Sequence, residues 1–89
     1  MLRLTVEDLG TALRLKLQGR LAGVWVPELA QSWRTLTARS PGTVLMVDLT
    51  HTDFVDLAGK YLLCLMYQAG VRLSAHSPHM MAVVAEIVG

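Results

Sequence analysis

The side chains that could perform chemistry are few in this 89-residue sequence, and three carboxylates lie close together in its middle. Asp48, Asp53 and Asp56 supply oxygens of the kind that acid/base pairs and Mg²⁺ sites use. Their positions favour structural roles instead. Asp53 is predicted to be a turn residue and Asp56 the N-cap of a following helix, while Asp48 ties a loop to the end of a strand. We therefore predict no metal or catalytic site at these carboxylates.

The thiol and imidazole groups do not form a recognisable reactive site either. Cys64, the only cysteine, lies in the apolar stretch "YLLCLMY", where a buried thiol behaves as a small hydrophobe. His76 and His79 are three residues apart, but zinc sites need three or four ligands and no cysteine or paired carboxylate accompanies them. The chain also lacks the glycine-rich phosphate-binding motifs. We predict a protein without enzymatic activity, metal or cofactor.

Two tryptophans could contact a ligand or another protein. Trp33 shares an apolar helical stripe and is predicted to be in the core. Trp25 lies between Gly23 and Pro27 and is flanked by valines, so it is harder to bury. The "VWV" stretch is therefore predicted to be an exposed apolar contact for a protein partner.

Composition limits the function classes further. The chain is 53% hydrophobic and 17% charged, with a formal net charge of +1, which predicts one folded domain spanning residues 1–89 with apolar surface to spare. This charge gives no electrostatic case for binding nucleic acid or an anionic membrane. No apolar run is long enough to span a bilayer, and the N-terminus does not resemble a signal peptide. The single cysteine excludes an internal disulfide and fits a reducing compartment. We expect a soluble cytoplasmic domain.

The hydrophobic pattern predicts an α/β domain. Alternating residues in 2–6 and 13–17 flank Asp8-Leu9-Gly10, which indicates an antiparallel hairpin. A helix is predicted from Pro27 to about Arg39, with Val26 extended before it. A buried strand at 43–49 is followed by a predicted loop at 50–56.

A second helix is predicted from about Leu57 to Ala69. A short strand then covers 71–75, and a last helix starts with Ser77 as N-cap and Pro78 in its first turn. The order β-β-α-β-α-β-α predicts a mixed sheet in which right-handed parallel crossovers follow the hairpin.

Several stretches together resemble the STAS domain, the fold of bacterial anti-sigma-factor antagonists and of sulphate-transporter tails. "VLMVDLTHTDFVDLAGKYLLCL" resembles the centre of the family, in which an apolar strand ending D-L-S and a short loop precede D-S-S-G-L and a helix. "LKLQGRLAGVWVPELAQSW" resembles its G-x-[LI]-D loop and first helix, and "GVRLSAHSPHMMAVVAEIVG" its next strand and helix. The matching residues are Gly19, Leu21, Pro27, Glu28, Leu29, Asp48, Leu49, Asp56, Gly59 and Gly70. The resemblance implies about four strands packed with about three helices.

Three departures from the family pattern matter. The serine that is phosphorylated in many members directly precedes the glycine, and here that position is Ala58, preceded by Leu57 in place of another serine. The family aspartate of G-x-[LI]-D is Ala22, which argues against nucleotide binding. Thr50 and Thr52 offer hydroxyls nearby but are interpreted as ordinary loop residues. The chain also ends before the strand and helix with which typical members continue.

The resemblance implies a signalling regulator that binds a protein and cannot be phosphorylated at the usual position. Its partner would be an anti-sigma factor or serine-kinase-like ATPase. The alternative is a cytoplasmic STAS accessory subunit of an ABC-type lipid-transport system, which would bind an ABC ATPase. Docking is predicted at the Thr52–Lys60 loop, and the sheet edge left by the missing strand predicts a possible homodimer. The partner-binding residues are predicted to be Asp56 and Gly59, which shape the turn, Leu57 and Ala58 as contacts, Lys60 as a rim charge, and Trp25.

Overall fold

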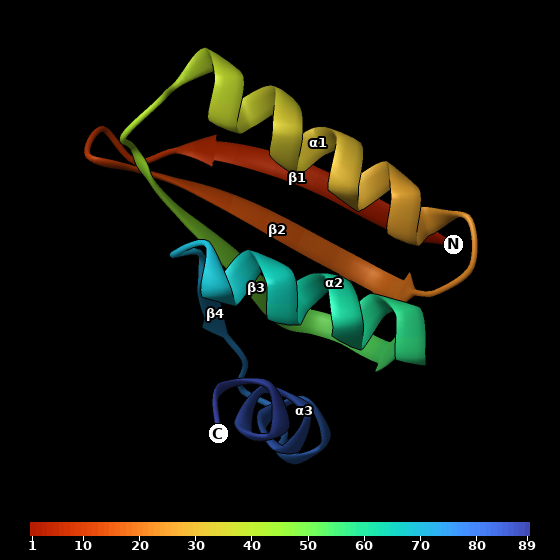
Figure 1. Ribbon diagram of the computed structural model, residues 1–89. Coiled ribbons are helices and arrows are strands. Elements are labelled where there is room, and N and C mark those ends of the chain that lie inside the picture. Colours follow the sequence, from red (N-terminus) through yellow and green to blue (C-terminus); the bar gives the residue numbers. More distant parts are fainter.

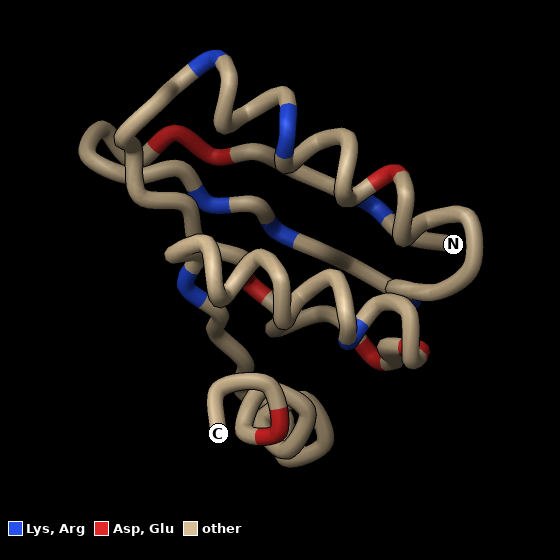
Figure 2. Tube along the Cα trace, viewed as in Figure 1, with Lys and Arg blue, Asp and Glu red and all other residues tan.

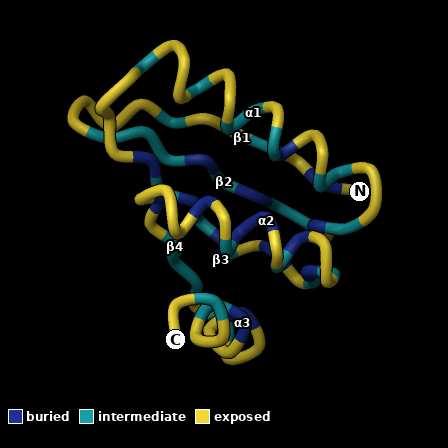
Figure 3. The backbone as a smooth tube through the Cα atoms, in the orientation of Figure 1, coloured by how far each residue is buried: buried dark blue, intermediate teal, exposed yellow.

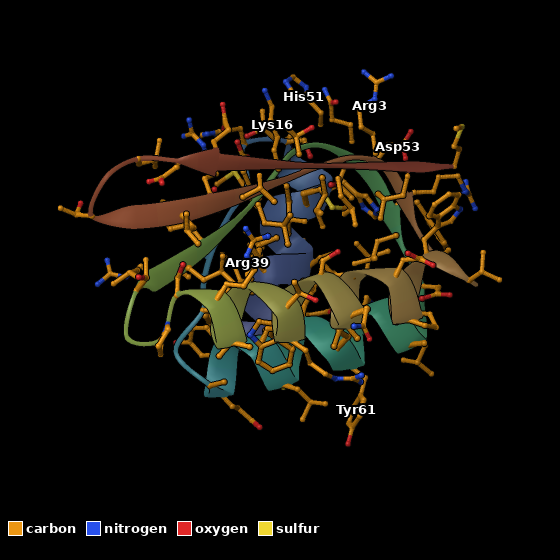
Figure 4. All side chains as sticks on the ribbon, turned by 90° about the horizontal axis from the view of Figure 1, so that it is seen from above. Arg3, Lys16, Arg39, His51, Asp53 and Tyr61 are labelled. Atoms are coloured by element: carbon orange, nitrogen blue, oxygen red, sulfur yellow. The ribbon has the colours of Figure 1, made fainter.

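The computed structural model describes residues 1–89 and contains a four-stranded mixed sheet with three helices. Helices α1 (Trp25–Arg39) and α2 (Leu57–Gln68) cover one face of the sheet, while α3 (Pro78–Val88) stands beside α2 near β4 (Figure 1). The opposite face is open to solvent. Figure 4 shows Lys16 and His51 pointing away from the helices on that side.

The predicted hairpin is confirmed. Strands β1 (Leu2–Asp8) and β2 (Ala12–Leu21) pair antiparallel without a register shift. The turn between them is closed by the Asp8 carboxylate, which accepts a hydrogen bond from the Gly10 N–H at 2.8 Å. Apolar residues such as Leu15 and Leu17 alternate with polar ones, so one face of the hairpin is buried under the helices.

The predicted mixed sheet, with parallel strands after the hairpin, is also confirmed, but the loop predicted at 50–56 is wrong. Strand β3 (Val44–Val55) pairs parallel with β2 and with β4 (Arg72–Ser74), giving the order β1-β2-β3-β4. Two register shifts between β2 and β3 each add a residue to β3. Its buried residues are therefore two apart up to Leu49 and then three apart, at Thr52 and Val55. These bulges hide the strand period from a sequence pattern.

Helix α1 begins at Trp25, two residues before the predicted start, so Val26 is helical and not extended. Pro27 is the third residue of the helix. It breaks no hydrogen bond there, because the first N–H groups of a helix have no partner within the helix. No side chain caps this helix start, since the N-cap residue is Val24.

The two later helices start at the predicted caps. The Asp56 side chain accepts a hydrogen bond from the Gly59 N–H at α2, and the Ser77 hydroxyl accepts one from the Met80 N–H at α3. Pro78 lies in the first turn of α3, as predicted. Both helices therefore begin where local sequence signals place them.

Fifteen buried hydrophobic residues form one core between the sheet and the helices. Figure 3 shows the buried positions along β2 and β3 and on the inner sides of the helices. Trp33, which was predicted to be in the core, packs against it but is only half-buried. Cys64 does not belong to it, contrary to the prediction, because its side chain is only partly buried on α2.

Candidate functional site

The turn between β3 and α2 is a single residue, Asp56, whose carboxylate joins two parts of the chain. Oδ1 accepts from the Gly59 N–H at 2.7 Å and caps α2. Oδ2 accepts from the Gly23 N–H at 3.0 Å and so holds the segment that leads into α1. The Asp56 N–H in turn donates to the Leu21 carbonyl at the end of β2 at 3.1 Å. Three hydrogen bonds therefore fix the turn to α2, to the segment before α1 and to the end of β2.

These contacts also set the charge of the turn. Hydrogen bonds from the backbone N–H groups of Gly23 and then Gly59 hold the pKa of the Asp56 carboxyl below its usual range, and they outweigh the opposing effect of burial. Asp56 is therefore ionised at neutral pH, with both oxygens occupied by the backbone. It shapes the turn, as the sequence indicated, and does not act as a free acid or base.

An Asp56→Asn variant is expected to lower the free energy of unfolding by about 1 kcal/mol at pH 7. The amide oxygen can still cap α2, but the amide nitrogen cannot accept from the Gly23 N–H. Because the folded pKa of Asp56 lies below the unfolded one, its contribution is complete above the unfolded pKa and is lost as the pH falls through the folded pKa. The difference between wild type and variant should therefore shrink below about pH 4, as measured by urea unfolding at several pH values.

The matched control is Asp53→Asn, since Asp53 is exposed on β3. This change should leave the free energy of unfolding almost unaffected at pH 7. At pH 2.5 the solution is about 1.4 units below the pKa of an aspartate in the unfolded chain. If the difference in free energy of unfolding between wild type and Asp56→Asn stays constant down to this pH, the role assigned to the ionised carboxylate is wrong.

Gly59 is buried and does not offer a surface to a partner. A Cβ at this position would lie 2.9 Å from the Leu21 carbonyl oxygen and 2.9 Å from Val55 Cγ1. Only glycine lets the first turn of α2 approach the ends of β2 and β3 this closely. The predicted partner residue Gly59 therefore acts by positioning its neighbours.

The residues around Gly59 form an exposed apolar tip. Leu57 is 82% exposed and Tyr61, four residues later on the same side of α2, is 68% exposed. Ala58 is exposed between them. Figure 4 shows Tyr61 pointing away from the sheet. Because Gly59 faces the core, the side chains on the other side of the turn must face solvent.

This tip is one wall of a shallow groove of about 850 Å³ between α2 and the end of α3. We call it the α2–α3 groove; it is lined by Leu57, Ala58, Lys60, Tyr61, Cys64, Glu86 and Ile87. Lys60 lies at the rim of this groove, where its Nζ pairs with Glu86 Oε2 at 3.2 Å; its contact with a partner stays a prediction. These are the only Lys, Arg, Asp or Glu residues of α2 and α3 (Figure 2). The groove is therefore almost entirely apolar, with one neutralised ion pair at its rim.

Sequence reasoning missed the groove residues Tyr61, Cys64, Glu86 and Ile87. A signal for two of them exists, because Leu57, Tyr61 and Cys64 recur at i, i+4 and i+7 on a side of α2 distinct from its buried residues. No local signal could place Glu86 and Ile87 there, since they come from α3.

The "VWV" stretch is only partly as predicted. Trp25 is half-buried and packs against the core, so it is not a freely exposed contact. Val24 is the exposed residue, at 74%. Because the N–H of the adjacent Gly23 donates a hydrogen bond to the Asp56 side chain, this exposed valine lies at the same end of the molecule as the start of α2.

The three central carboxylates do not converge. Asp48 lies within β3, not at its end, and accepts hydrogen bonds from the Thr50 N–H and hydroxyl. Burial alone would raise the pKa of Asp48, but these hydrogen bonds and the nearby cations Arg14 and Lys16 lower it overall. Asp53 lies in β3 and not in a turn, contrary to the prediction, and is exposed on the open face of the sheet (Figure 4).

The two threonines interpreted as loop residues also lie in β3. Thr52 is buried and its hydroxyl donates to the Leu17 carbonyl at 3.0 Å, while the Thr50 hydroxyl is engaged by Asp48. Neither presents a free hydroxyl at the α2–α3 groove. No group of three or more His, Cys, Asp or Glu side chains is placed to hold a metal ion, and none of the helices is long and apolar enough to cross a membrane.

Comparisons with known proteins identify the fold. No family model and no curated protein sequence matches the chain. Among solved structures, it is similar to an anti-sigma factor antagonist from Mycobacterium paratuberculosis, with a TM-score of 0.76 and 25% identity over 88% of this chain and 70% of that one. An uncharacterized DUF3478-family protein with a SpoIIAA-like fold from Shewanella loihica gives a TM-score of 0.59 and 18% identity, covering 89% and 71% of the two chains. The structure of Mglu gives a TM-score of 0.62 and 25% sequence identity. This match covers 83% of the present chain but only 19% of Mglu.

These likenesses, with the observed strand order, show that the chain has a STAS-like, SpoIIAA-like α/β fold. The predicted fold class is confirmed.

Proposed function

We propose that residues 1–89 form one non-enzymatic STAS-type module that binds a partner protein through the α2–α3 groove. The observation that carries this proposal is the exposed apolar tip, where Leu57 is 82% and Tyr61 is 68% exposed beside an almost uncharged groove. Exposed apolar surface of this kind marks interaction sites. Full burial of a leucine side chain contributes about 1.5–3 kcal/mol, so two such residues can anchor an interface.

The proposed role follows from the similarity to a solved structure described as an anti-sigma factor antagonist. In this proposal the chain acts in the bacterial cytoplasm and regulates transcription by binding an anti-sigma factor or serine-kinase-like ATPase. No nucleophile–base pair supports an enzyme: the Cys64 thiol has the Gln68 amide, at 3.7 Å, as its polar neighbour. Ala58 carries no hydroxyl, so docking at this turn is independent of phosphorylation there.

The direct test is affinity capture from a lysate of the source cells, with bound proteins identified by mass spectrometry. Recovery of a histidine-kinase-like ATPase together with a sigma factor would support the proposed role. Recovery of an ABC ATPase with its permease would assign the chain to lipid transport instead. Capture of neither class by a folded chain would contradict both assignments.

A pair of substitutions at Ala58 tests the absence of phospho-control. Ala58→Ser adds a hydroxyl without charge and should leave partner affinity within about twofold. The Ala58→Asp variant should fold normally, because a negative side chain interacts favourably with the positive N-terminal end of α2. In the complex, however, this aspartate would place a charge in an apolar interface. We expect the aspartate to weaken binding at least about tenfold, as a desolvated unpaired charge costs more than 1.4 kcal/mol.

Isothermal titration calorimetry with the captured partner measures both affinities, and incubation of Ala58→Ser with ATP and a cell lysate shows whether the new hydroxyl is phosphorylated. Unchanged binding by Ala58→Asp would mean that the partner does not cover this turn.

A further inference from the structure

Strand β1 is a free edge of the sheet with little to prevent another strand from pairing with it. Its seven residues pair with β2 alone, in one continuous register without a bulge. The strand contains no proline or lysine, which are the residues that commonly protect such edges. The other edge, β4, has only three residues, and α3 stands beside it (Figure 1). Of the two edges, β1 is the longer template for pairing.

The free hydrogen-bonding groups of β1 belong to its even-numbered residues. At one end of the hairpin the Met1 carbonyl accepts from the Arg20 N–H at 3.2 Å, and at the other the Leu9 N–H donates to the Ala12 carbonyl at 2.8 Å. In an antiparallel pair, residues alternate between those bonded to the neighbour and those that point outward. The odd residues therefore face β2, and the N–H and C=O groups of Leu4 and Val6 point to the open edge.

We propose that two copies of the chain pair antiparallel through β1, with Thr5 of each copy at the twofold axis. The sequence "LRLTVED" is self-complementary in this register. Arg3 lies opposite Glu7 of the second copy, whose carboxylate also pairs with Arg14 of its own chain at 2.7 Å, so each dimer contains two opposite-charge pairs between the copies. Leu4 lies opposite Val6 of the second copy, and these two residues form the hydrogen-bonded pairs that the outward backbone groups require.

Neighbouring registers lack this match. A symmetric shift in one direction places Arg3 opposite Thr5, and a shift in the other places Thr5 opposite Glu7. The ion pairs are lost in both cases. A shift that mixes odd with even residues would leave the outward N–H and C=O groups unpaired. Charge complementarity therefore selects one register.

The proposed contact also covers apolar surface and leaves the other site free. Val6 is 49% exposed beside Thr35 and Arg39 of α1, and pairing at the edge would bury it. Strand β1 lies at the opposite end of the sheet from β4 and α3 (Figure 1). The α2–α3 groove would thus remain open on each copy, and this proposal does not depend on the proposed function.

Disulfide trapping tests the geometry in a Cys64→Ser background, which leaves one thiol in each variant. At a non-hydrogen-bonded pair the two Thr5 Cα atoms would be about 4.5 Å apart, within reach of a disulfide. Thr5→Cys is therefore expected to form covalent dimers in mild oxidant. Lys16→Cys is the matched control, because Lys16 lies beside Thr5 on β2 and its two copies would be three strand spacings, about 14 Å, apart. Ser74→Cys reports on the β4 edge.

Charge exchange tests the register. Arg3→Glu and Glu7→Arg each place like charges opposite each other twice in a dimer, and each variant alone should dimerise about tenfold more weakly than wild type. An equimolar mixture restores two opposite-charge pairs in the heterodimer and should regain wild-type association in sedimentation velocity runs. A mixture that behaves like its components, a wild type that stays monomeric at millimolar concentration, or cross-linking by Ser74→Cys in preference to Thr5→Cys would overturn the proposal.

Discussion

A Gly59→Ala variant is expected to be less stable than wild type by about 2 kcal/mol, the middle of the range for overpacked sites. The added Cβ would lie 2.9 Å from the Leu21 carbonyl oxygen and from Val55 Cγ1, and 3.1 Å from Leu21 Cγ. The carbonyl belongs to the backbone of β2 and cannot rotate away, so α2 must shift outward. For a chain of this size the melting temperature should fall by roughly 8–16 °C in thermal unfolding followed by circular dichroism.

Ala58→Ser is the control for Gly59→Ala, because Ala58 is the adjacent residue but is exposed. Its melting temperature should stay within about 3 °C of wild type. If Gly59→Ala melts as high as wild type, α2 does not approach the strand ends as closely as described, and the helix preference of alanine has prevailed.

Leu57→Asp is expected to reduce partner affinity at least about thirtyfold while leaving the fold intact. The leucine is 82% exposed in the free protein, so its loss removes no core contact. An aspartate at the first position of α2 interacts favourably with the helix dipole, so the variant should fold. In a complex the same carboxylate would be desolvated in an apolar interface, and loss of an anchor residue costs about 2 kcal/mol or more.

The matched control is Met81→Asp. Met81 is also apolar, exposed at 54% and near the start of a helix, but it does not line the α2–α3 groove. Titration of the captured partner into both variants, with circular dichroism to confirm folding, separates a local effect from a general one. Equal loss of affinity in both variants, or in neither, would place the docking surface elsewhere.

The turn at Asp56 separates two tasks that share a few residues. Asp56 and Gly59 are committed to the fold, one through hydrogen bonds to Gly23 and Gly59 and the other through close packing against β2. Leu57 and Ala58 between them carry no structural contact of this kind and are free to define the surface. Variants of the first pair should therefore act on stability, and variants of the second pair on binding.

Much of the fold was predictable from sequence because its signals are local. Alternation around the Asp8–Gly10 turn, the caps Asp56 and Ser77, and Pro78 at the start of α3 each act within a few residues. The parallel pairing of the later strands followed from the alternation of strands and helices along the chain. In the site, the same local reasoning identified Asp56 as a cap, while the family resemblance pointed to Leu57 and Ala58 as contact residues.

Tertiary structure alone decided the remaining features. Strand β3 runs on to Val55 because β2 offers it a partner as far as Leu21, across two bulges that shift its period. Helix α1 starts early, and Trp25 is half-buried, because the core lies beneath that end of the helix.

The α2–α3 groove exists because α3 packs beside α2. That packing brings Glu86 to Lys60, although the two residues are 26 positions apart in sequence, and it leaves Cys64 on a surface and not in the core. Such contacts depend on how whole elements pack together, which no window of neighbouring residues encodes. The sequence by itself determined most of the helices and strands, and it placed Leu57 and Ala58, which carry no reactive group, at the start of α2. The packing of α3 against α2 decided that these two residues line an apolar groove.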